Sequence, residues 1–590
     1  GAALHAFSGI ARGEAAGAQV SGRTRFGATA LALALLALPH AAHANFVIVN
    51  MDSPGEGFND PTVVAPVGGN PGTTVGQQRL NVFTKAGQIW DALLQSPITI
   101  RVQASFDPLP CGVSSGVLGG AGANVLDSDF TGAGFAATWY VGAEANRLAN
   151  TDLDPVDDDI VAQFNSIIGT ATCLTSRSWY YGFDGNEGAT GIDLLPVLLH
   201  ELGHGLGFLT TTDETNGLYL AGQPGIFDRF LMDNLSDKHW VDMTPTERIA
   251  SSINTNHLVW DGPAVTAAAP HFLGKRAHVV TTGALIGDFA SGQGVFYPPL
   301  TTTGVTGNVV LVADGVGTTT DGCNTPFTNA AAIAGKIALM DRSTTCTMPQ
   351  QAANAQANGA IAAIIINNAA GPEPPLRGAA PTVTIPVASL SQTDGNALRT
   401  ALGSGTVTAN IALDASRTAG VDNAGRVLMY APNPDQPGSS VSHWDVSAFP
   451  NLLMEPAINP DLTQSVDLAF HNFYDIGWFP QLVDVPADAR AALSFTHAPN
   501  PTLDGGTLRF RLPSAQHVEL SLYDLAGRRV ARLVNGTLDG GEHSVAWPRT
   551  DEHGRRVAAG VYLARIKAGA LQRTLNVVLA IPMSLLGTIA

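Results

Sequence analysis

The chain has 590 residues, and 31 Lys and Arg stand against 49 Asp and Glu, so its formal net charge is −18. Its 45% hydrophobic content excludes global disorder and collagen, because enough apolar surface exists to offset the entropy of the chain. The length predicts several domains rather than one core. The acidic balance would repel a phosphate backbone, and we therefore expect no nucleic-acid partner.

The N-terminal segment predicts export. Two arginines precede an apolar run over residues 26–38, and the small residues Ala42 and Ala44 follow. This order is typical of a secretory signal peptide. We assign residues 1–44 to a signal peptide with an extended n-region and expect cleavage near Ala44, which would make the protein secreted, extracellular or at the cell surface. No later segment is apolar over the roughly 20 residues of a membrane helix, so no transmembrane segment is expected.

Residues 45–266 alternate between strand and helix patterns. Phe46–Val49 is a short apolar strand, Gln88–Leu94 has a helical pattern, and the alternation over Ile98–Ala104 predicts another strand. We expect an α+β region that forms the N-terminal part of a catalytic domain.

An acidic cluster precedes the apolar run Ile160–Phe164, for which we predict a helix. Carboxylates near the start of a helix are favoured by the helix dipole. The alternative is a calcium site, although the spacing matches no EF-hand loop. The cluster consists of Asp152, Asp154, Asp157, Asp158 and Asp159.

The composition changes over residues 267–417, which are rich in Thr, Gly, Ala and Val and poor in charge. This indicates a separate β-rich module, here called the inserted module, in which Ile361–Ile366 is expected to be a buried strand. Aromatic and charged residues return over residues 418–484, which we take as the C-terminal part of the catalytic domain.

The last segments are a linker over residues 485–495, a domain over 496–580 and an unassigned tail over 581–590. Leu508, Phe510 and Leu512 alternate with polar residues, and turn residues separate such runs, which predicts a β-sandwich. This domain is basic. A solvated sheet face is one interpretation of the charge, and contact with an anionic cell surface is the other.

Four cysteines allow three pairings, and export favours disulfides. Proximity in sequence favours Cys111 with Cys173 and Cys323 with Cys346. The alternative is four free buried thiols.

The segment from Ile192 to Phe208 carries the strongest chemical signal. Asp193 suits the start of a helix, and on that helix His200 and His204 are four residues apart, so both imidazoles project from one face. Neutral imidazoles at this spacing bind Zn²⁺, the metal lowers the pKa of water towards 7, and Glu201 can take the proton.

A catalytic zinc site needs a third protein ligand. In the extended pattern with a third histidine after the glycine, Gly207 is present, but Thr210 stands where that histidine would be. The third ligand must therefore come from elsewhere, and the candidates are Asp213, Glu214, Asp228, Asp233, His239 and the distant His443.

Residues His443-Trp444, followed eleven residues later by Met454, resemble the leishmanolysin branch of the metzincins. The resemblance implies that His443 is the third zinc ligand, that Met454 is the residue of the Met-turn beneath the metal, and that the fold is a metzincin-type zinc protease domain. The implied activity is that of a zinc metalloendopeptidase with Glu201 as general base and protein or peptide substrates.

Two further resemblances concern the other domains. The inserted module resembles a protease-associated (PA) domain on residues such as Asp321-Gly322-Cys323 and Ile364-Ile365-Ile366-Asn367-Asn368. The last domain is similar to the immunoglobulin-like modules of flagellar-hook-capping and secretion-sorting proteins, on Tyr523-Asp524-Leu525-Ala526-Gly527 and Gly560-Val561-Tyr562. These resemblances imply a non-catalytic module that affects substrate access and a bacterial export or surface module.

The sequence therefore predicts a multidomain α+β protein that acts as a secreted zinc endopeptidase. Two alternatives stay open: a zinc exopeptidase, whose cleft the inserted module narrows to chain ends, and a non-catalytic surface adhesion protein with a degenerate site. Zinc is the expected cofactor, and calcium would be a second one only if the acidic cluster binds it.

Overall fold

The computed structural model describes residues 46–479 except 95, 379–382, 458–461 and 463, and a second unit over residues 495–579 with internal gaps at 499–501, 503–504, 513–514, 524–527, 559 and 569–570. The expected signal peptide and the tail over residues 581–590 lie outside the described residues, as does the expected linker apart from residue 495. The two units are described separately.

A four-stranded sheet begins the first unit, in the order β1-β2-β6-β3. β1 (Phe46–Asn50), β2 (Ile100–Asp107) and β6 (Ile160–Asn165) are parallel, and β3 (Gly119–Ala123) runs antiparallel to β6 at the edge. The strands expected at Phe46 and Ile98 are thus present, the second beginning two residues later.

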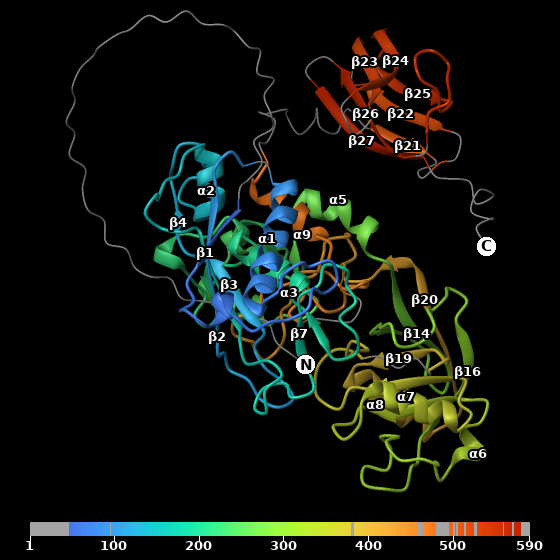
Figure 1. Ribbon diagram of the computed structural model, residues 1–590. Coiled ribbons are helices and arrows are strands. Elements are labelled where there is room, and N and C mark those ends of the chain that lie inside the picture. Colours follow the sequence, from blue (N-terminus) through green and yellow to red (C-terminus); the bar gives the residue numbers. More distant parts are fainter. Residues whose placement is uncertain are drawn as a thin grey trace, which may run out of the picture. The chain divides into compact units, whose positions relative to one another are not determined.

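Two helices pack beside this sheet, α1 (Val75–Leu93) and α3 (Leu194–Gly205) (Figure 1). The helix expected at Gln88 is the last part of α1, which starts at the Thr74 cap. Phe83 and Trp90 of α1 are fully buried with Phe164 of β6 in the main core. This packing holds α3 against the edge of the sheet.

The helix predicted over Ile160–Phe164 is wrong, because these residues form β6. Ile160, Ala162 and Phe164 are buried on the face of the strand towards the core, and β6 pairs with β2 on one side and β3 on the other. The preceding aspartates are therefore not at the start of a helix. Asp158 forms an ion pair with Arg101, and Asp159 accepts a hydrogen bond from the Arg101 backbone N–H.

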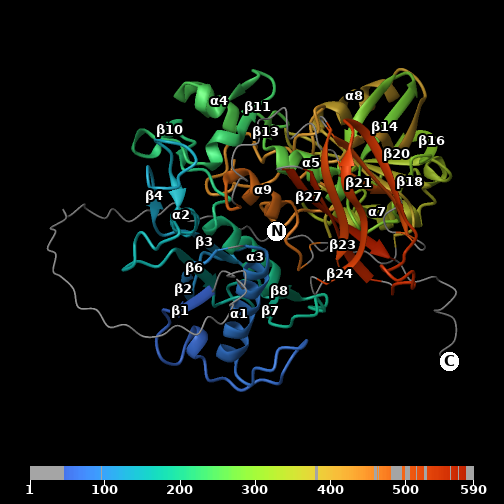
Figure 2. The same ribbon diagram turned by 90° about the horizontal axis from the view of Figure 1, so that it is seen from above.

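Helices α4 (Pro245–Ser252), α5 (Pro263–Phe272) and α9 (Leu468–Ile476) and the three-stranded sheet β12-β11-β13 complete the part that carries the histidines. α5 and α9 lie side by side (Figures 1 and 2). Asp475 of α9 accepts hydrogen bonds from the backbone N–H groups of Ala264 and Val265, which anchors the start of α5. The remaining short elements of this part are η1 (Gly57–Asn59), β4 (Leu126–Asp127), β5 (Tyr140–Val141), α2 (Gly142–Ala149), β7 (Ser178–Tyr180), β8 (Gly191–Asp193), β9 (Thr212–Asp213), β10 (Leu218–Tyr219), η2 (Leu220–Gly222), η3 (Phe227–Phe230), β11 (Leu231–Asp233), β12 (Lys238–His239), η4 (Trp240–Asp242) and β13 (Leu258–Trp260).

The inserted module is built on a seven-stranded sheet in the order β15-β14-β20-β16-β17-β18-β19. Its first and last strands in sequence, β14 and β20, pair with each other, so the module leaves and rejoins the rest of the chain at neighbouring positions. The strand expected at Ile361 is β18, which is fully buried. The module's elements are β14 (Lys275–Gly283), β15 (Gly287–Ser291), β16 (Val305–Leu311), α6 (Ala330–Ile333), β17 (Ile337–Asp341), α7 (Met348–Ala357), β18 (Ala362–Ile366), β19 (Val387–Leu390), α8 (Gln392–Leu402) and β20 (Val407–Thr418).

The second unit is all-β, with a three-stranded sheet β21-β22-β25 and a four-stranded sheet β24-β23-β26-β27. Leu508, Phe510 and Leu512 are buried, as their alternation with polar residues predicts. The strands are β21 (Phe495–Ala498), β22 (Gly506–Leu512), β23 (Gln516–Tyr523), β24 (Arg529–Leu538), β25 (Gly541–Trp547), β26 (Gly560–Ala568) and β27 (Leu571–Leu579).

Both predicted disulfides are confirmed. Cys111 is bonded to Cys173, and Cys323 is bonded to Cys346 inside the inserted module. Among the described residues, no helix has the length and apolar character needed to cross a bilayer.

Candidate metal centre

Helix α3 positions two of the candidate ligands. The Asp193 carboxylate accepts a hydrogen bond from the Leu195 N–H and so caps the helix, as the sequence predicts. The helix ends at Gly205, and Gly207 has a φ of 116°, a left-handed conformation that favours glycine. His200 and His204 therefore lie one helical turn apart, both fully buried.

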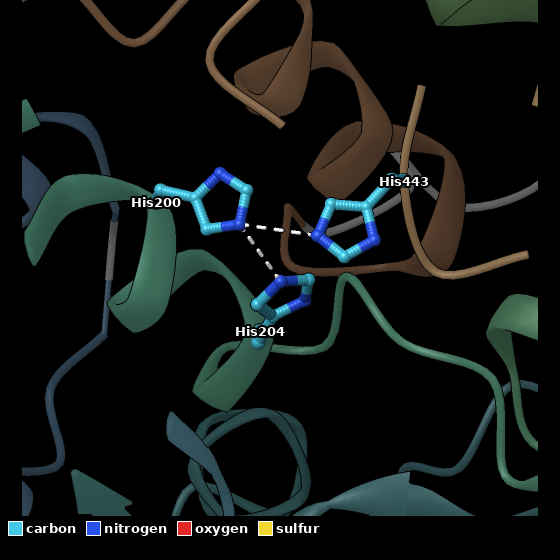
Figure 3. Close-up of side chains that lie close together, drawn as sticks. All are labelled: His200, His204 and His443. Atoms are coloured by element: carbon cyan, nitrogen blue, oxygen red, sulfur yellow. Dashed lines mark hydrogen bonds between the residues drawn. The ribbon is translucent and has the colours of Figure 1, made fainter. Parts of the chain in front are cut away.

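His443 follows the inserted module in the sequence, but its imidazole lies beside those of His200 and His204. Its Nε2 lies 3.2 Å from Nε2 of His200, and Nε2 of His204 lies 3.1 Å from Nε2 of His200 (Figure 3). One ligand atom from each of the three imidazoles lies within 4.8 Å of the others. Three ring nitrogens from two distant segments therefore converge on one point.

The hydrogen-bond partners of the three Nδ1 atoms indicate which nitrogen of each imidazole carries the hydrogen. Nδ1 of His200 faces the Leu453 carbonyl oxygen at 2.6 Å, Nδ1 of His204 faces that of Phe208 at 2.7 Å, and Nδ1 of His443 faces that of Ser439 at 2.7 Å. A carbonyl oxygen only accepts, so each Nδ1 carries the hydrogen and each neutral Nε2 presents a lone pair. Three lone pairs that face one another repel unless a cation lies between them.

Burial favours the neutral form of the two helical histidines. It lowers the pKa of His200, with His204 lowering it further, and it lowers the pKa of His204 to about 4. Tetrahedral zinc with Zn–N distances of 2.0–2.1 Å places its nitrogen ligands about 3.3 Å apart. The two Nε2 contacts are close to that value, so the donor set fits Zn²⁺.

Glu201 is buried beside the histidines, with one oxygen held and the other without a partner. Its Oε2 accepts a hydrogen bond of 2.9 Å from the Ala121 N–H on edge strand β3, and Oε1 is buried without a hydrogen bond. Burial raises the pKa of Glu201 well above its usual range, and the Ala121 N–H lowers it in part. The arrangement leaves one carboxylate oxygen available to a ligand such as water.

The segment around Met454 packs against α3 and contacts His200. Met454 is fully buried, and a Cβ added to Gly203 would lie 2.8 Å from its Sδ, so the methionine packs against the backbone between the two helical histidines. The preceding Leu453 accepts the hydrogen bond from His200. The Trp444 N–H donates to the Met454 carbonyl, which joins this segment to that of His443.

The other candidates for the third ligand have different partners. Asp228 is buried and accepts hydrogen bonds from Thr210, Thr211, Thr212 and the Gly225 N–H. The remaining contacts are Asp213 with Thr215, Asp233 with Asn254 and His239 with Asp261. Neither these residues nor Glu214 nor the Asp152–Asp159 cluster belongs to a metal-binding group in the described part of the chain, so nothing supports a calcium site there.

Sequence reasoning missed the groups that orient the centre. The Ala121 N–H and the carbonyls of Leu453, Phe208 and Ser439 are backbone groups, and every residue type carries them. No pattern of side chains could have indicated them.

Glu144 on α2 is a second buried carboxyl that the sequence did not indicate. Both of its oxygens are buried without a hydrogen bond, and they lie near Gly207 and Gly477, the glycines that follow α3 and α9. Burial raises its pKa well above the usual range, and Arg147 lowers it in part.

We therefore expect Glu144 to make stability depend on pH. The folded state keeps its proton above the unfolded pKa near 4.5, so ionisation of the unfolded state lowers the free energy of unfolding as pH rises, by up to about 1.4 kcal/mol per pH unit. Glu144→Gln should remove this slope and gain stability relative to wild type between pH 5 and 7. Urea unfolding at several pH values measures it, with the exposed Glu56→Gln as control. Parallel curves for wild type and Glu144→Gln would contradict the assignment.

Comparisons with known proteins identify two domains. Residues 305–398 match the PA domain family, and residues 500–571 match the FlgD Ig-like domain family. No curated protein matches the chain.

Solved structures share small parts of the chain. The zinc aminopeptidase BSAP from Bacillus subtilis is 21% identical over 26% of this chain and 37% of its own, with a TM-score of 0.17. An aminopeptidase from Aneurinibacillus sp. strain AM-1 is 16% identical over 34% of this chain and 44% of its own, also at 0.17. FlgD from P. aeruginosa is 25% identical over 12% of this chain and 55% of its own, at 0.11. The chain thus spans less than half the length of either aminopeptidase. Of the expected domains, a PA domain and a C-terminal FlgD Ig-like domain are present in this protein.

Proposed function

We propose that this protein is a zinc-dependent peptidase, and more narrowly a secreted metalloendopeptidase of the metzincin type. The observation that carries the proposal is the convergence of three neutral Nε2 lone pairs, from His200, His204 and His443, beside the free oxygen of Glu201. No other group in the described part of the chain combines three buried potential ligands with an unpartnered carboxylate oxygen.

Zinc, when bound by the three histidines, would supply a Lewis acid for the carbonyl of the scissile bond and for water. Glu201 would act first as general base, with Oε1 accepting a proton from the attacking water. The same carboxyl would then donate that proton to the leaving amine. The Ala121 N–H holds Oε2, which would leave Oε1 for the proton of the water.

Strand β3 supports an extended peptide as the substrate. It lies at the edge of its sheet, and no described strand pairs with its outer side. Its sequence, Gly-Gly-Ala-Gly-Ala, has small side chains that allow another backbone to approach closely. A peptide that added as a further strand would pass directly beside Glu201, which favours cleavage within a chain.

Digestion of a long peptide with an acetylated N-terminus and an amidated C-terminus tests the proposal. An endopeptidase is expected to yield internal fragments by mass spectrometry, and treatment with a zinc chelator should abolish cleavage until Zn²⁺ is restored. Cleavage only after the ends are unblocked would indicate an exopeptidase. Purified protein that binds no zinc and cleaves neither peptide would favour the adhesion alternative.

We further propose that the protein is secreted and that its C-terminal domain contacts an anionic cell surface. Residues 496–580 carry eleven Lys and Arg against seven Asp and Glu in an otherwise acidic chain. The exposed Arg529 and Arg532 lie on β24 and the exposed Arg565 on β26, the two strands that flank β23 in the four-stranded sheet.

A further inference from the structure

A cavity of about 510 Å³ lies where the inserted module meets the part that carries the histidines. Arg276, Ser291 and Glu373 line it from the module. Asp445 and Val446 line it from the segment that directly follows His443 and Trp444. The cavity is therefore separate from the three imidazoles but is in part formed by the chain segment that carries one of them.

Two carboxyl groups face this space with few partners. Asp445 is 6% exposed, and its Oδ1 accepts a hydrogen bond from the Ser447 N–H. The Glu373 side chain forms no hydrogen bond with another described residue and lies close enough to Asp445 for the two to interact electrostatically.

The lining also contains a positively charged group, the guanidinium of Arg276. A terminal nitrogen of Arg276 lies 3.6 Å from Asp414, and its Nε is buried without a hydrogen bond. Arg276 and Glu373 line the same cavity.

The remaining charged groups of the lining are held by neighbours. Arg426 is bound by Asp422 and lies 3.5 Å from Asp261. The Nδ1 of His257 is hydrogen-bonded to Asn234. Among the charged groups of the lining, Glu373, Asp445 and the Nε of Arg276 are thus the ones with the fewest partners.

We propose that this cavity binds a short peptide with free termini, its ammonium group against Glu373 and Asp445 and its carboxylate against Arg276. The volume lies in the range of roughly 300–1,000 Å³ that small-molecule sites occupy and far exceeds what a bare metal ion fills. A ligand with both charges would contact all three groups, whereas a simple cation would leave the buried Nε of Arg276 without a hydrogen bond and a simple anion would face two carboxyls.

This inference does not rest on the proposed peptidase activity, because each recognising group belongs to the cavity and not to the metal centre. Since residues 445–447 directly follow His443 and Trp444, an occupied cavity would also connect the inserted module to the segment of the third histidine. The expected ligand has the chemistry of a peptidase product.

Calorimetric titration of the full chain with the dipeptide Ala-Ala tests the proposal. The Glu201→Gln variant is used so that no peptide is cleaved, and the titration is repeated after zinc is removed with a chelator. We expect binding of one dipeptide per chain, unchanged without zinc. N-acetyl-Ala-Ala and Ala-Ala amide should each bind at least about tenfold more weakly, because each lacks one charge.

Substitutions in the inserted module test whether the dipeptide binds in this cavity. Arg276→Gln and Glu373→Gln, each in the same background, should weaken Ala-Ala binding at least about tenfold. Lys275→Gln removes the neighbouring exposed charge on the same strand and should leave the affinity for Ala-Ala within twofold of the parent's. A melting temperature close to that of the parent shows that a variant is folded. If only one of the two variants folds, its binding result alone tests the site. Binding that disappears with zinc, that ignores both module substitutions, or that is absent for Ala-Ala would overturn the proposal.

Discussion

Glu201→Gln is expected to lower the turnover number for a cleaved peptide by about 10²–10⁴-fold while leaving zinc content unchanged. General acid–base groups contribute rate enhancements of this size. A glutamine has nearly the same shape, and its carbonyl oxygen can still accept the hydrogen bond from the Ala121 N–H, so the local structure should persist. Steady-state kinetics together with metal analysis of the purified variant measure both quantities.

The control for this substitution is Glu56→Gln, which changes an exposed glutamate in a turn before η1 and should leave turnover intact. If Glu201→Gln retained full activity with zinc bound, the carboxylate would not be the general base. If it lost zinc as well, its role would be to support the metal site, because a pure proton-transfer group holds no metal.

His443→Ala is expected to reduce zinc affinity by more than about 100-fold and to abolish peptide cleavage at ordinary zinc concentrations. Loss of an outer group that only orients a ligand costs 10–100-fold in affinity, so loss of a ligand should cost more. The remaining His200 and His204 form an incomplete site for catalytic zinc. Competition with a fluorescent chelator gives the affinity, and activity against added zinc gives the functional effect.

His239→Ala is the matched control, because His239 is half-buried and paired with Asp261 away from the three imidazoles. It should retain zinc affinity within a few-fold. Equal zinc affinity in His443→Ala and the wild type would contradict the assignment of the third ligand, whatever the activity of either variant.

The local elements of the candidate site could be predicted from the sequence. The spacing of His200 and His204 places two imidazoles on one face of any helix, and Asp193 begins that helix through a contact two residues away. The pairing of Cys323 with Cys346 is also local, because the two are 23 residues apart. The assignment of His443 as the third ligand depended on the family resemblance, because His443 and His200 are 243 residues apart in the chain.

The error at Ile160–Phe164 has a clear physical origin. A short apolar run is compatible with both a buried strand and a buried helix, and its neighbours in space decide between them. Here β2 and β3 offer backbone partners on both sides, so the run becomes a central strand. These partners come from segments 37 or more residues earlier in the chain, which a local pattern does not include.

Residue patterns alone predict the helix that carries two histidines and a carboxylate, the two disulfides and the alternating strands of the C-terminal sandwich. Each follows from periodicity or from proximity along the chain. Three contacts depend on the folded chain: Nε2 of His443 lies beside those of the other two histidines, the Ala121 N–H donates to Glu201, and Arg276 and Glu373 line a cavity with Asp445. Those contacts join segments far apart in sequence, some of them through backbone groups, and the packing of the whole unit brings them together.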